Sequence, residues 1–93
     1  MRRANGIDEF YSRELPNEDS LELFVDQYGS PTIDYPHVHI IHHGNHPSPH
    51  MRGLVQIVAS DMYGNKVWRT EIPNFPDGHQ VEEAVREARS RIW

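Results

Sequence analysis

The chain contains no cysteine, and this absence excludes several kinds of site at once. Disulfides, iron–sulfur clusters, thiolate zinc sites and cysteine nucleophiles all require a thiol. Long apolar runs are also missing, since no stretch approaches the roughly 18–20 residues that a membrane span needs. The arginines near the start of the chain are not followed by the apolar segment of a signal peptide. We therefore expect a cytoplasmic protein that does not enter a membrane.

Basic residues are scarce in the first part of the sequence. Residues 8–34 hold eight acidic side chains and one base, Arg13, and the whole chain has a net charge of −5 with histidine neutral. Nucleic-acid phosphates attract the opposite balance of charge. The composition therefore argues against nucleic acid as a partner.

The length of 93 residues fits one domain. We expect a flexible tail at 1–7, as is common at chain termini, followed by a single α+β domain at 8–93. A chain of this size buries only about 60–65% of its unfolded surface, so we expect a thin core and modest stability.

A first helix is predicted at 18–28. Apolar residues recur there at i, i+3, i+4 and i+7 from Leu21 to Tyr28, which is the spacing of one helical face. The same helix would carry an acidic face that includes Glu22 and Asp26. This face fits one alternative function, an acidic inhibitor of a basic nucleic-acid-binding protein.

Three strands are predicted in the middle of the chain. Their ranges are 37–43, 53–60 and 66–72, separated by a long hairpin loop at 44–52 and a turn at 61–65. The second strand is apolar on both faces, which is typical of a central strand. Short connections favour an antiparallel meander.

A second helix is predicted at 78–91, where Asp77 and Gln80 have capping-box spacing. The resulting fold is a two-layer α-β-β-β-α domain, in which a three-stranded antiparallel meander has both helices on one face. This order of elements is similar to that of the double-stranded RNA-binding domain. That family needs lysines at the start of its last helix to grip phosphates, whereas this chain has Glu82 and Glu83 there. RNA binding is therefore not expected.

Six of the seven histidines fall within residues 37–50, on the first predicted strand and in the loop after it. Imidazole suits zinc, nickel and copper, and residues i and i+2 of a strand project from one face roughly 6.5–7 Å apart. Binding of zinc or nickel is therefore a second alternative function. The candidate ligands are His37, His39, His43, His46 and His50. His37 and His39 share a face of the strand, and one of the other three would complete the coordination shell.

The preferred hypothesis is contact with another protein. With both helices on one sheet face, the opposite face is open, and it carries apolar and histidine side chains next to the histidine-rich hairpin. The partner would be another protein or a second copy of the chain. The residues expected to contact it are His37, His39, Ile41 and Val55, together with the acidic Glu22 and Asp26 of the first helix.

No set of residues predicts catalysis. The six serines lie in no nucleophile-elbow context, and the six glycines are scattered singly rather than gathered in a phosphate-binding loop. We therefore expect a small non-enzymatic protein without a cofactor, apart from the zinc or nickel alternative.

Overall fold

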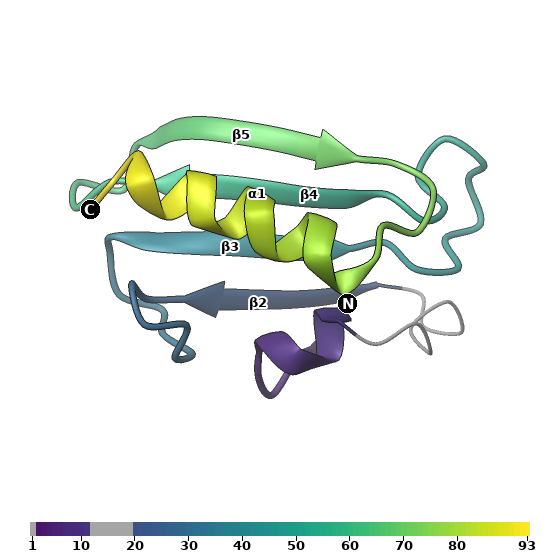
Figure 1. The fold of residues 1–93 in the computed structure, drawn as a ribbon, viewed down its shortest axis with the longest axis horizontal. Helices are drawn as coiled ribbons and strands as arrows, with labels where there is room; N and C mark the ends of the chain where they lie inside the picture. Colours follow the sequence, from purple (N-terminus) through teal and green to yellow (C-terminus); the bar gives the residue numbers. More distant parts are fainter. Residues whose placement is uncertain (1, 12–19) are drawn as a thin grey trace.

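The computed structural model describes residues 2–11 and 20–93, which form a small α+β domain (Figure 1). Among these residues, no helix combines the length and the apolarity of a membrane span. The elements are, in chain order, strand β1 (Arg2–Arg3), the 3-10 helix η1 (Ile7–Tyr11), strands β2 (Leu21–Val25), β3 (His37–His42), β4 (Val55–Ser60) and β5 (Lys66–Ile72), and helix α1 (Gly78–Ser90).

The strands form one sheet in the order β1-β2-β3-β4-β5. Strand β1 runs parallel to β2, and each later pair is antiparallel. A row of paired residues crosses the sheet from β2 to β5. Because side chains alternate along a strand, this row and the positions two residues away share one face. The row consists of Leu23, Ile40, Ile57 and Thr70.

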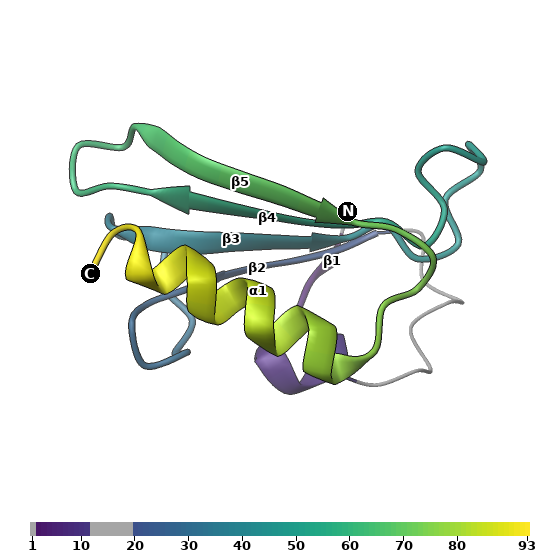
Figure 2. The same cartoon turned by 45° about the horizontal axis from the view of Figure 1, so that its top comes forward.

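The core lies between that face and the helices. Helices α1 and η1 lie on the same side of the sheet (Figure 2). Helix α1 buries Val81, Val85 and Ala88, and η1 adds Phe10. The buried sheet residues of this core are Leu21, Leu23, Val25, Val38, Ile40, Val55, Ile57 and Ala59.

The three predicted strands are found as β3, β4 and β5, within a larger sheet than the predicted meander. Strand β4 starts later than predicted because Gly53 has a φ of 75° and belongs to the loop. A side chain at Gly53 would collide with the ring of Phe75, since an added Cβ would lie 2.6 Å from its Cδ2. The close approach of these residues therefore fixes the end of the histidine-rich loop.

The predicted second helix is confirmed as α1. The Asp77 carboxylate accepts from the backbone N–H of Gln80 at 2.9 Å, and the Gln80 side chain accepts from the backbone N–H of Asp77 at 3.2 Å. Both halves of the predicted capping box are thus present.

The helix predicted at 18–28 is wrong where the structure describes it. Residues 18 and 19 lie outside the described part of the chain, and the next residues form β2 and a turn. The fully buried residues are Leu21, Leu23 and Val25, which follow the period of a strand. Tyr28, which the helix would place on its apolar face, is 82% exposed.

The predicted α-β-β-β-α order is therefore wrong, and the similarity to the double-stranded RNA-binding domain is lost with it. The sheet has five strands, and α1 is the α-helix of the described residues. Within the predicted tail at 1–7, the described residues 2–4 lie along the sheet. Arg2 and Arg3 pair with Leu21 and Glu22 of β2, and Ala4 is only 4% exposed.

Candidate binding face

The side of the sheet opposite α1 carries the residues that alternate with the core positions. Strand pairing brings them into rows that run from β2 to β5. We call this surface the open face. It comprises Glu22, Phe24, His37, His39, Ile41, Gln56, Val58, Ser60, Arg69 and Glu71.

An aromatic stack joins the first three strands on the open face. The rings of Phe24 and His39 lie 4.0 Å apart with an interplanar angle of 8°, and the Arg3 guanidinium lies 5.2 Å from the Phe24 centroid. The His39 ring and the Arg3 guanidinium both contact the electron-rich face of the Phe24 ring. The stack therefore orders His39 and Arg3 at this edge of the sheet.

His39 also contacts an acid. Its Nε2 lies 3.1 Å from Glu22 Oε2, while Arg3 approaches the other carboxylate oxygen at 3.8 Å. Burial lowers the pKa of His39 below its ordinary value, and Glu22 opposes that shift. Since the net direction is downward, His39 is neutral at neutral pH and its Nε2–H donates to the carboxylate.

His37 is wedged between aromatic rings and is only 5% exposed. Its ring centroid lies 4.9 Å from that of Phe24 and 4.5 Å from that of Tyr35. Nδ1–H donates to the Asp34 carbonyl at 3.1 Å. Burial lowers the pKa of His37, and this hydrogen bond opposes the shift. His37 therefore stabilises the open face by packing against Phe24 and Tyr35, and little of its side chain is accessible to a partner.

An open groove of about 490 Å³ lies on this face over β3, β4 and β5. Its apolar lining comes from Ile41, Val58 and Val67, and two bases, Lys66 and Arg69, stand along it. Among the residues that the structure describes, none that lines the groove is acidic, although the chain has a net charge of −5. The lining is completed by His39, Gln56 and Trp68. Such a groove favours a ligand that offers apolar and negatively charged groups together.

A chain of hydrogen bonds fixes His43 beside this groove. Gln56 Nε2 donates to Glu71 at 2.8 Å, so Gln56 Oε1 faces His43 Nε2 at 2.7 Å. Because that oxygen only accepts, Nε2 of His43 carries a proton, and Nδ1 of the neutral ring keeps a lone pair. His43 Nδ1 is buried and has no hydrogen-bond partner among residues 2–11 and 20–93. Its lone pair is therefore left for a hydrogen-bond donor or a metal ion.

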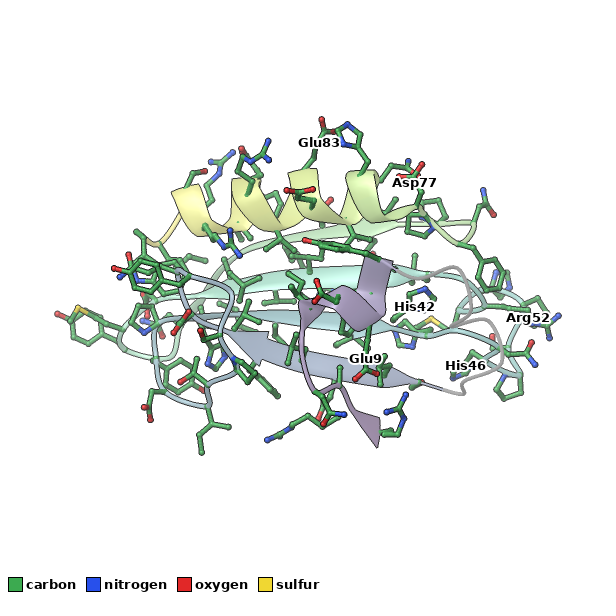
Figure 3. All side chains as sticks on the ribbon, turned by 60° about the horizontal axis from the view of Figure 1, so that its bottom comes forward. Glu9, His42, His46, Arg52, Asp77 and Glu83 are labelled. Atoms are coloured by element: carbon green, nitrogen blue, oxygen red, sulfur yellow. The ribbon has the colours of Figure 1, made fainter. Side chains whose placement is uncertain are left out.

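The other histidines of the cluster have separate surroundings, and Figure 3 shows two of them, His42 and His46. His42 lies on the core face, and its Nδ1 accepts from the backbone N–H of Gly44 at 2.9 Å. The His46 ring lies 5.8 Å from that of His43, and His50 is exposed. In the described part of the chain, no group of three or more His, Asp or Glu side chains is arranged to hold a metal ion. The five candidate ligands are thus not gathered into one cluster.

Of the residues predicted to contact a partner, four share the open face: Glu22, His37, His39 and Ile41. Val55 does not. It is fully buried and stands opposite His42 and Ile72 on the core face. The prediction that Val55 contacts a partner is therefore corrected, because the open-face positions of β4 are Gln56, Val58 and Ser60.

Glu22 and Asp26 do not form an acidic helical face. Glu22 lies on the open face, where it contacts Arg3 and His39. Asp26 follows β2, and its Oδ1 accepts from the backbone N–H groups of Tyr28 and Ser30 at 2.8 and 3.0 Å. Both carboxylates are engaged within the domain, and the helix on which the inhibitor hypothesis depended is a strand and a turn.

Sequence reasoning missed the basic side of the groove and a second exposed apolar area. That area lies where the β2–β3 loop, the β4–β5 turn and the C-terminal residues meet (Figure 1). A hollow of about 530 Å³ there has a largely apolar lining. The exposed large side chains around it are Tyr35, Met62, Tyr63 and Trp93. The signal in the sequence was the Met62-Tyr63 pair inside a predicted turn, where polar residues are usual.

No family model, curated protein or solved structure matches this chain. The assignment of a function therefore rests on the geometry of the open face.

Proposed function

We propose that this domain binds an acidic segment of another protein in the groove on its open face. The observation that carries the proposal is the lining of the groove, to which residues 2–11 and 20–93 contribute aliphatic side chains and two bases but no acid. An acidic segment with aliphatic side chains would place carboxylates near Lys66 and Arg69 and apolar groups against Ile41. This is a binding function, and it assigns no catalytic role to the open face.

Electrostatics supports an acidic partner over a basic one. The chain as a whole is acidic, so a basic partner would be drawn to many parts of its surface. An acidic segment would be repelled by the acidic parts of the surface and attracted at Lys66 and Arg69, which favours docking in the groove. A groove of about 490 Å³ holds only a few side chains, so we expect weak, transient binding of the kind found at small interfaces.

The proposal predicts that a labelled peptide of alternating acidic and aliphatic residues binds the protein. Reversing one basic charge, with Lys66→Glu, should weaken this binding about tenfold, because the variant places like charges together. The matched control is Arg86→Glu, which makes the same charge change on an exposed residue of α1. Fluorescence anisotropy measures the affinity of each variant.

Three results would contradict the proposal: equal affinity for a peptide in which lysine replaces each acid, equal losses for Lys66→Glu and Arg86→Glu, or no binding of the acidic peptide. A loss caused by Tyr63→Ser and not by Lys66→Glu would instead place binding at the exposed aromatic end of the domain.

A second candidate function, binding of zinc or nickel, is favoured by the buried lone pair of His43. Metal-bound histidines usually donate their other ring N–H to an oxygen, as His43 does to Gln56. The His46 ring lies 5.8 Å from that of His43. Four of the five predicted ligands then form two pairs, His43 with His46 and His37 with His39, and double variants test each pair separately. The fifth, His50, is exposed.

This second candidate predicts stoichiometric binding of zinc to untagged, chelator-treated protein in calorimetry. We expect His43→Ala with His46→Ala to abolish the signal, and His37→Ala with His39→Ala to leave it, because His39 already contacts Glu22 and His37 donates to Asp34. Weak, non-stoichiometric heats in the unmodified protein would exclude a specific site.

A further inference from the structure

Strand β5 is an outer strand of the sheet. It is seven residues long, and no strand of the described residues pairs with its outer side. Figure 1 shows α1 crossing in front of β3 and β4, which leaves β5 along one margin of the domain. An outer strand presents a row of unpaired backbone N–H and C=O groups that another strand can use.

The core face of β5 is also incompletely covered. Trp68, Thr70 and Ile72 are only half-buried, whereas the residues opposite them on β4 are fully buried. An open groove of about 400 Å³ runs between these three residues and α1. The sheet thus ends in a strip of partly apolar surface directly beside unpaired backbone.

The sequence of β5 restricts how it could pair with itself. In a symmetric antiparallel pair that continues the sheet, opposed side chains point to the same side of the sheet. The two-fold axis must then lie where one residue of β5 is opposite the same residue of the second copy. An axis at Arg69 or Glu71 would place like charges opposite each other. An axis at Thr70 places Arg69 of each copy opposite Glu71 of the other, which gives two pairs of opposite charge.

We propose that β5 pairs antiparallel with β5 of a second copy of this chain, with Thr70 opposite Thr70. On the open face, two Arg69–Glu71 pairs then flank the axis. On the core face, Trp68 of each copy meets Ile72 of the other, an aromatic and β-branched pair of the kind that stabilises sheets. The half-buried side chains of Trp68, Thr70 and Ile72 in one copy then pack beside those of the other copy. The two sheets form one continuous sheet.

This inference goes beyond the proposed peptide groove and does not rest on it. Lys66, which tests the groove, lies outside the pairs formed by residues 68–72. Loss of peptide binding in Lys66→Glu with unchanged self-association, or the converse, would therefore separate the two proposals.

The cysteine-free chain allows a direct test of the register. Directly opposed residues in antiparallel strands have Cα atoms roughly 4.5–5.5 Å apart, which suits a disulfide. We expect Thr70→Cys to form a covalent dimer under mild oxidation at native pH. Glu71→Cys should not, because its opposite residue is Arg69. Equal cross-linking of both variants, or none with Thr70→Cys, would overturn the register.

Charge reversal tests the same pairing without a cross-link. Sedimentation equilibrium should show a reversible dimer for the unmodified chain and about tenfold weaker association for Arg69→Glu, which places acids opposite acids. Combining Arg69→Glu with Glu71→Arg should restore the original affinity, because opposite charges face each other again. A chain that stays monomeric at its highest soluble concentration, or a double variant as weak as the single one, would refute the proposal.

Discussion

Replacing Leu23 by alanine is expected to lower the free energy of unfolding by about 2–5 kcal/mol. Leu23 is fully buried and stands opposite Ile40 in the row that crosses the sheet. Truncation would leave a cavity among β-branched neighbours that have little freedom to fill it. Small domains have total stabilities of roughly 5–15 kcal/mol, so this loss is a large share. Urea denaturation followed by tryptophan fluorescence measures the change.

Tyr28→Ala is the matched control, and we expect it to change stability by no more than about 0.5 kcal/mol. Tyr28 is 82% exposed in the turn after β2. The helix predicted at 18–28 makes the opposite forecast, since Tyr28 lies on its apolar face and Leu23 does not. A small effect of Leu23→Ala together with a large effect of Tyr28→Ala would favour that helix over β2.

The elements that could be predicted from sequence are those whose signals are local. The capping pair Asp77 and Gln80 lies three residues apart, and the β4–β5 turn is marked by Asp61 and Gly64. Strand β2 carries two overlapping patterns, because Leu21 and Val25 fit both a helical face and an alternating strand. Whether residues 21–25 form a helix or a strand depends on pairing with β3, which begins a dozen residues later in the chain. The sequence of residues 21–25 alone does not indicate this pairing.

That one error also limited what could be predicted of the binding face. Phe24 falls on the apolar face of the helix predicted at 18–28, whereas it stacks on His39 in the open face. Alternation along β3 placed His39 and Ile41 on that face correctly. The basic side of the groove depends on β5 lying beside β4, so Arg69 could be placed next to Val58 only once the register was known.

Strand β5 lies at the centre of both proposals. Its Lys66 and Arg69 line the peptide groove, and its residues 68–72 form the proposed dimer contact. In such a dimer the two open faces look to the same side of a continuous sheet, so two grooves flank the axis. Binding of a partner with two acidic segments would then gain from their effective concentration.

The stability of the protein is expected to fall steeply as the pH drops below about 6.5, the ordinary pKa of histidine. Burial lowers the pKa of three histidines in the folded chain: His37, His39 and His42. The unfolded chain therefore binds more protons than the folded one in this window, and stability is fully present above about 6.5 and is lost as the pH falls. Each such histidine contributes a slope of up to about 1.4 kcal/mol per pH unit.

His42→Asn isolates one of these contributions. His42 is 4% exposed on the core face, its pKa is lowered by burial and then by the neighbouring His43, and its Nδ1 accepts from the Gly44 N–H. An asparagine oxygen can accept from the N–H two residues on without titrating. Urea unfolding across pH 5–7 should show a slope reduced by up to about 1.4 kcal/mol per pH unit, whatever stability the smaller side chain costs. An unchanged slope would mean that His42 binds its proton equally well in both states, and that burial on this face does not hold it neutral.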